Sequence, residues 1–175
     1  MSGIARGLDY VSRESIKENL VHGNLKPSNI MLSETEEPLI SEYGIWGFLD
    51  PTRAFLYSDG YKAPEKKLTK EADIFSFGVI LLELLTGKIV GKDSINLPKW
   101  VKSMVREEWT GEVFDKEVRT EGKQWAFPLL NIALKCASDR PERRPNISEV
   151  LEKIEDVVTS QEHCSFSSSS SEEPN

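Results

Sequence analysis

Apolar side chains change their spacing several times along the chain, and each change predicts a different element. Residues 2–17 carry them at helical spacing and predict an amphipathic helix. Residues 20–40 carry short apolar runs between polar loops, which is typical of small β-strands flanking a loop. Residues 41–65 contain several glycines and prolines without a regular period, which predicts a long irregular loop. Loops of this length in a compact domain usually have a function.

The most apolar segment of the chain follows this loop. Thr69 is a suitable N-cap, and a helix is predicted to run from it to a C-terminal glycine, Gly87. Because the segment is hydrophobic on most faces, we expect a central, buried helix. A second, amphipathic helix is predicted over residues 97–105.

Two more helices are predicted toward the end of the domain. Residues 129–136 have helical apolar spacing, and Pro128 is expected in the first turn of that helix, where a proline removes no hydrogen bond. The last helix is expected to open with Asn146 and Glu149, which form a pair that resembles a capping box.

Length and composition then narrow the class of protein. The 175 residues, 38% of them hydrophobic, suffice for one domain with a sizeable core, which we place at residues 1–159. Residues 160–175 are rich in Ser and Glu and are predicted to be a disordered tail. The net charge of −7 and the lack of a dense basic run argue against nucleic acid as a partner. No apolar stretch reaches the roughly 20 residues of a membrane-spanning helix, so we expect a cytoplasmic protein without a membrane span.

Candidate chemistry is concentrated in the middle of the chain. Residues 22–29 read HGNLKPSN, which matches the protein-kinase catalytic-loop pattern H-R-D-L-x-x-x-N in order and spacing. Residues 42–44 read EYG where that pattern would be followed by D-F-G, and residues 63–65 read APE. Residues 73–78, DIFSFG, and residues 143–145, RRP, complete an ordered series that is far more specific than any one motif.

On these motifs the chain resembles the C-terminal lobe of a eukaryotic-type protein kinase. Within that family it is similar to the plant leucine-rich-repeat receptor-like kinases, and among them to the group called probable inactive receptor kinases, on residues 21–26, 97–101 and 105–115. The resemblance implies a mainly α (α+β) fold, a helical bundle with small β-hairpins around a catalytic loop at residues 22–29. It also implies that the activation segment lies at residues 42–65.

The same resemblance implies ATP and Mg²⁺ as cofactors and gives roles to four residues. Asn24 stands in place of the catalytic base, Lys26 would reach the transferred phosphate, and Asn29 and Glu42 would hold metal ions. An amide cannot take a proton, and loss of a general base costs about a hundredfold to ten-thousandfold in rate. Glu42 is one methylene longer than the usual aspartate, which weakens metal binding. An alternative is that Lys26 and Asn29 only brace the loop.

Four further residues are expected to be structural. The resemblance implies that Asp73 holds the loop backbone from the central helix and that Glu65 and Arg144 form a buried ion pair. His22 is expected to brace the loop by packing. Gly23 replaces the arginine that in many kinases pairs with a phosphate on the activation segment. A phosphate switch through that arginine is therefore not expected.

Taken together, these observations predict a pseudokinase. No G-x-G-x-x-G followed by a V-A-I-K lysine occurs in the chain, so we expect the N-terminal lobe to be absent and the surface facing it to be apolar. We expect a non-catalytic lobe that binds other receptor kinases or signalling proteins. The alternatives are a serine/threonine protein kinase that transfers phosphate from ATP to proteins, and a truncated part of a receptor kinase. Full-length members of this family are plasma-membrane proteins with the lobe inside the cell.

Overall fold

Helices make up most of the protein. The structure is a computed structural model that describes residues 1–14, 20–45, 60–91, 95–107, 110–121 and 123–167. The elements follow one another as α1 (Ser2–Glu14), the 3₁₀ turn η2 (Pro27–Asn29), β1 (Ile30–Leu32), β2 (Pro38–Ile40), α4 (Lys70–Thr86), α5 (Leu97–Arg106), η3 (Thr110–Val113), α6 (Lys116–Glu121), α7 (Lys123–Cys136), η4 (Pro141–Arg143) and α8 (Ile147–Ser167). This arrangement confirms the predicted mainly helical fold with a small β-hairpin.

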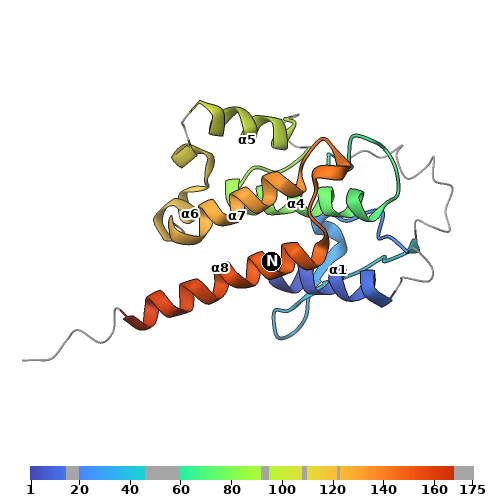
Figure 1. Cartoon of the computed structure of the whole chain (residues 1–175), viewed down its shortest axis with the longest axis horizontal. Coiled ribbons are helices and arrows are strands. Elements are labelled where there is room, and N and C mark those ends of the chain that lie inside the picture. The colour runs from blue at the N-terminus through green and yellow to red at the C-terminus, as the bar shows by residue number, and fades with distance from the viewer. Residues whose placement is uncertain (15–19, 46–59, 92–94, 108–109, 122, 168–175) are drawn as a thin grey trace, which may run out of the picture.

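Helix α4 lies at the centre of the molecule, with α7 packed along it and α5 above (Figure 1). The Thr69 hydroxyl accepts a hydrogen bond from the Ala72 N–H at 3.2 Å, and Gly87 ends the helix in the left-handed region at φ 67°. Most side chains of the helix are buried, with Phe77 and Leu82 fully enclosed, whereas Leu84 is exposed. The prediction of a central, buried helix between these two caps is therefore confirmed.

The backbones of α4 and α7 approach each other directly at Gly78. A Cβ atom at Gly78 would lie 2.7 Å from the Cβ of Cys136 and 2.9 Å from the carbonyl oxygen of Ala133. Cys136 is fully enclosed, and burial raises the pKa of its thiol to about 12. A thiol in this state is inert and acts as a small apolar side chain.

Helices α1 and α8 pack side by side below α4 and α7 (Figure 1). Asn146 accepts from the Glu149 N–H at 2.9 Å, and Glu149 accepts from the Asn146 N–H at 3.3 Å, so the predicted capping box is present. The helix continues to Ser167, however, beyond the end predicted near Thr159. Because neither glycine nor proline occurs between residues 147 and 167, nothing in the local sequence ends it earlier.

Two other expectations need correction. Helix α7 begins at Lys123, so Pro128 lies in its interior and not in its first turn. The missing N–H of this proline is tolerated because Ala126 and Leu130 on either side are buried against the core. Residues 20 and 21 form no strand, although Val21 is buried, whereas β1 and β2 pair antiparallel with Ile30 opposite Ile40. Residues 15–17 of the first predicted helix lie outside the described residues.

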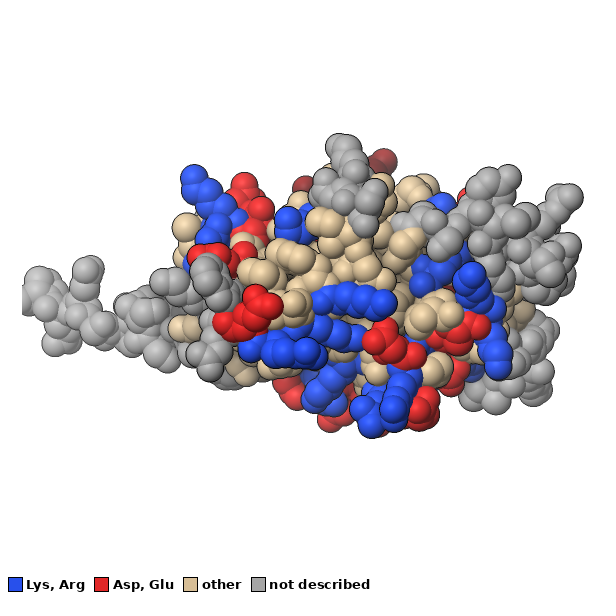
Figure 2. Space-filling view, turned by 90° about the horizontal axis from the view of Figure 1, so that it is seen from above, with Lys and Arg blue, Asp and Glu red and all other residues tan. Residues whose placement is uncertain are grey.

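The surface carries both signs of charge. Figure 2 shows Lys and Arg side chains gathered in a band on the face seen from above, with Asp and Glu side chains among them. Charges interspersed in this way produce small local fields instead of one continuous patch.

Candidate functional site

The loop at residues 22–29 is attached to the central helix through one buried carboxylate. Asp73, in the first turn of α4, accepts hydrogen bonds from the backbone N–H groups of His22 at 2.7 Å and Gly23 at 2.8 Å. Burial raises the pKa of the Asp73 carboxyl to about 6, although the two backbone donors act in the opposite direction. The loop and the helix that the sequence predicted to be in contact are therefore joined directly.

His22 fills the space behind the loop. Its side chain is fully buried, its Nδ1 accepts from the Asn24 N–H at 3.2 Å, and its ring meets the ring of Tyr43 edge-on at a centroid distance of 5.7 Å. Since Nδ1 accepts, the proton of the neutral ring lies on Nε2, which has no hydrogen-bond partner in the described part of the chain. Burial lowers the pKa of His22 and favours this neutral form. These contacts are those of a packing residue.

Three of the predicted site residues meet in one cluster. The Asn24 Nδ2 donates to Glu42 Oε2 at 3.4 Å, and the Asn29 Nδ2 donates to the same oxygen at 3.1 Å. Asn29 Nδ2 also donates to the backbone carbonyl of Asn24 at 2.9 Å. Asn24 and Asn29 are buried, whereas Glu42 is exposed and has a left-handed backbone, with φ 59°.

A fourth member of the cluster, Lys62, was not predicted. Its Nζ donates to Asn24 Oδ1 at 3.2 Å and to the backbone carbonyl of Gly23. Lys62 comes directly before the A-P-E triplet and occupies no position that a motif or a periodicity singles out. Its contact with the loop spans 38 residues, so only the fold reveals it.

Lys26 lies beside this cluster in sequence. It directly precedes the turn η2 with an extended backbone (φ −161°, ψ 161°), and its side chain is half-buried. The turn brings Asn29 back toward Asn24, which explains why the spacing between these two residues matters.

The cluster is a poor fit for Mg²⁺, the metal that the motif resemblance implies, because several of its side-chain oxygens already accept hydrogen bonds. Mg²⁺ requires oxygen ligands, commonly one or two carboxylates. Here Oε2 of Glu42 faces two amide N–H groups, and Oδ1 of Asn24 faces the ammonium of Lys62. Both oxygens of Asp73 accept from backbone N–H groups. Within the described residues, no group of three or more His, Cys, Asp and Glu side chains is placed to hold a metal ion.

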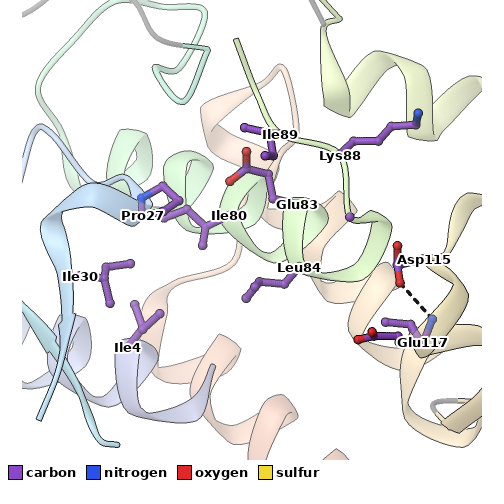
Figure 3. Close-up of a pocket in the computed structure, with 12 residues that line it drawn as sticks. Ile4, Pro27, Ile30, Ile80, Glu83, Leu84, Lys88, Ile89, Asp115 and Glu117 are labelled. Atoms are coloured by element: carbon purple, nitrogen blue, oxygen red, sulfur yellow. Dashed lines mark hydrogen bonds between the residues drawn. The ribbon is translucent and has the colours of Figure 1, made fainter. Parts of the chain in front are cut away.

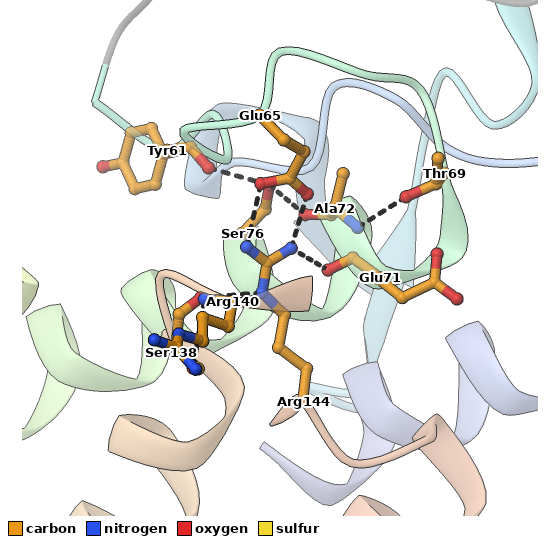
Figure 4. Close-up of polar contacts among 9 residues, drawn as sticks. All are labelled: Tyr61, Glu65, Thr69, Glu71, Ala72, Ser76, Ser138, Arg140 and Arg144. Carbon is orange, nitrogen blue, oxygen red and sulfur yellow. Dashed lines mark hydrogen bonds and ion pairs between the residues drawn. The ribbon is translucent and has the colours of Figure 1, made fainter. Parts of the chain in front are cut away.

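Glu65, the last residue of the A-P-E triplet, forms an ion pair with Arg144 of the helical part (Figure 4). Arg144 Nη1 and Nη2 donate to the two carboxylate oxygens of Glu65 at 2.6 and 2.9 Å, and Arg144 also donates to the backbone carbonyls of Glu71 and Ser138. Burial alone would raise the pKa of Glu65, but the hydrogen bonds and charge of Arg144 outweigh it and the pKa is lowered. This is the buried pair that the resemblance implied.

An apolar groove of about 620 Å³ opens next to the loop (Figure 3). Ile4 of α1, Pro27 and Ile30 line one side, and Ile80 and Leu84 of α4 line the other. Leu84 is 57% exposed although it belongs to the central helix. Four charged side chains, Glu83, Lys88, Asp115 and Glu117, also lie along this mostly apolar groove.

Comparison with known proteins identifies the family. The family described as the protein kinase domain matches residues 1–154. The chain belongs to this family. A probable inactive receptor kinase of Arabidopsis thaliana is 37% identical over 172 residues, which cover 89% of this chain and 25% of that protein. The leucine-rich repeat receptor-like protein kinase PXC1 of the same plant is 37% identical over 187 residues, which cover 92% of this chain and 28% of the relative.

A solved kinase-family structure agrees with these relatives. The pseudokinase domain of BIR2, described as an immune regulator of the RLK/Pelle family, superposes with a TM-score of 0.79 at 28% identity, covering 91% of this chain and 51% of that domain. The predicted similarity to plant receptor-like kinases, including probable inactive ones, is thus confirmed. This kinase-family chain spans about a quarter of the length of the curated relatives it matches. None of its described helices is both long and apolar enough to cross a membrane.

Proposed function

We propose that this chain is a pseudokinase lobe that transfers no phosphate and acts by binding proteins in receptor-kinase signalling, on the cytoplasmic side of the membrane. One observation carries the proposal. Asn24, at the position of the catalytic base, has both polar ends of its side-chain amide engaged, one by Lys62 and the other by Glu42. The loop thus has a neutral group, already hydrogen-bonded, where transfer requires a proton acceptor.

The surroundings of Asn24 oppose catalysis further. The ammonium of Lys62 lies 3.2 Å from Asn24 Oδ1, so a cation, which can only donate, faces the atom that would have to receive the hydroxyl proton. Loss of the base alone costs about a hundredfold to ten-thousandfold in rate. The relatives named as probable inactive receptor kinases and the pseudokinase domain of BIR2 support the same proposal.

The alternative is a serine/threonine kinase, or part of one, that transfers phosphate from ATP. Asn29 and Glu42 favour it. Both stand at metal-ligand positions of the motifs, and Asn29 Nδ2 lies 3.1 Å from Glu42 Oε2. Lys26 also retains the phosphate-contacting position of the catalytic loop.

Phosphate transfer from ATP to a generic protein substrate distinguishes the two functions. The purified chain is assayed with Mg-ATP beside Asn24→Asp, which restores the carboxylate, and Asn24→Ala, which removes both polar atoms. We expect no transfer by the unmodified chain and no rise of its thermal unfolding temperature with Mg-ATP. Robust transfer by the unmodified chain, lost in Asn24→Ala, would overturn the pseudokinase proposal.

Protein binding needs a separate test. The folded chain is immobilised and exposed to a panel of purified cytoplasmic domains of plant receptor kinases, with heat-unfolded chain as the control. We expect at least one domain to be retained by the folded chain alone. Retention of none of them would contradict the binding role.

A further inference from the structure

The four-residue cluster around Asn24 joins three segments that are distant in sequence. Asn24 and Asn29 belong to the catalytic loop, Glu42 follows β2, and Lys62 precedes the A-P-E triplet. The contacts run without a break from Lys62 through Asn24 to Glu42 and back through Asn29, at 3.2, 3.4, 3.1 and 2.9 Å. Side chains of the protein itself therefore connect all three segments.

We propose that these residues form a metal-independent lock, in which the Lys62 ammonium and the Asn24 amide hold the catalytic loop, Glu42 and the end of the activation segment together. This lock deepens the proposed function, since it makes the arrangement of the site independent of nucleotide and magnesium.

As long as Glu42 is a carboxylate, the chemistry of the contacts requires an amide at position 24. A lysine ammonium can only donate and an ionised carboxylate can only accept, so the Asn24 oxygen must face Lys62 and its nitrogen must face Glu42. An aspartate would keep the contact with Lys62 but would place a second carboxylate oxygen against Glu42. Two carboxylates that share a site repel each other unless a proton or a cation lies between them.

The charges of the cluster also favour an arrangement without a metal ion. Lys62 and Glu42 cancel, and the two asparagines are neutral, so the four side chains carry no net charge. A divalent cation in this position would find Asn24 Oδ1 already bound by the Lys62 ammonium and Glu42 Oε2 already bound by two side-chain amides. The two amide donors also hold Glu42 in its left-handed backbone, a conformation that costs a residue with a side chain on the order of 1 kcal/mol.

Metal titration tests the lock. Thermal unfolding is followed in EDTA and in MgCl₂ or MnCl₂, without ATP or any partner, for the unmodified chain and Asn24→Asp. Asn131→Asp, which makes the same chemical change at an exposed position of α7, is the matched control. We expect no metal response in the unmodified chain or the control. Asn24→Asp should unfold at least about 4 °C lower in EDTA and recover with metal.

A compensating variant separates the lock from simple loss of packing. When Asn24→Asp is combined with Glu42→Gln, the amide introduced at position 42 can donate to the carboxylate introduced at position 24. That carboxylate still accepts from Lys62. We expect this double variant to regain most of the unfolding temperature lost in Asn24→Asp, and to do so in EDTA.

Two results would overturn the lock. One is metal stabilisation of the unmodified chain equal to that of Asn24→Asp, and the other is a double variant no more stable than Asn24→Asp. Neither result depends on phosphate transfer or partner binding. The lock can therefore fail while the proposed function stands, and the transfer assay can fail while the lock stands.

Discussion

Replacing Glu65 by alanine removes the ion pair that connects the A-P-E triplet to the helical core. The Arg144 side chain is fully buried and that of Glu65 is 16% exposed, and the two form a bidentate pair at 2.6 and 2.9 Å. In Glu65→Ala the guanidinium keeps its bonds to the backbone carbonyls of Glu71 and Ser138. It loses its counter-charge and remains inside the protein.

The burial of the pair sets the loss of unfolding free energy expected for Glu65→Ala. Removing one partner of a buried ion pair costs about 3–5 kcal/mol, and we expect about 3 kcal/mol here, because two carbonyls still solvate part of the charge. The exposed pair of Arg6 and Glu155, at 2.9 Å with side chains 64% and 44% exposed, is the matched control. Glu155→Ala should cost less than about 1 kcal/mol. Urea unfolding of each variant gives the free energies to be compared.

Two results would refute this explanation. If Glu65→Ala loses no more stability than Glu155→Ala, the buried pair contributes little. If the stranded charge is the cause of the loss, Arg144→Met combined with Glu65→Ala should lose clearly less than the sum of the two single losses, since neither charge then remains buried and only the bonds to the carbonyls of Glu71 and Ser138 are missing. A double variant that loses the sum of the two single losses would show that packing, and not charge, is responsible.

Two further predictions concern α4. Gly78→Ala should lower the urea midpoint by the equivalent of about 1–3 kcal/mol through overpacking against Cys136, and an unchanged midpoint would mean that α4 and α7 separate without cost. The pKa of Asp73 is raised from 3.8 to about 6, so its contribution to stability is full below about pH 4 and is lost as the pH rises through about 6. Between about pH 4 and 7 the free energy of unfolding of the unmodified chain should fall by up to about 3 kcal/mol relative to that of Asp73→Asn. If urea unfolding gives the same difference between the two proteins at every pH, the raised pKa is contradicted.

Local signals made part of this structure predictable from sequence. Thr69 and Gly87 set the ends of α4 because capping depends on hydrogen bonds within a few residues. The motif spacing likewise singled out Asn24, Asn29 and Glu42, and the structure brings these three residues into one cluster. The sequence did not predict the contact of Lys62 with Asn24, because this contact forms only when segments distant in sequence fold together. Pro128 was placed wrongly because tertiary packing of α7 overrides the local preference against an interior proline.

The two sets of contacts in and beside the A-P-E triplet bear on different properties of the lobe. Glu65 is joined to Arg144 on the helical side, and Lys62, three residues earlier, is joined to Asn24 on the loop side. The first set stabilises the fold, and in the proposed lock the second set takes the place of ligand-dependent closure. The proposed lock predicts one arrangement of these loops whether or not nucleotide is present. Under the proposed function, a binding partner would then respond to the amount of this protein and not to its nucleotide state.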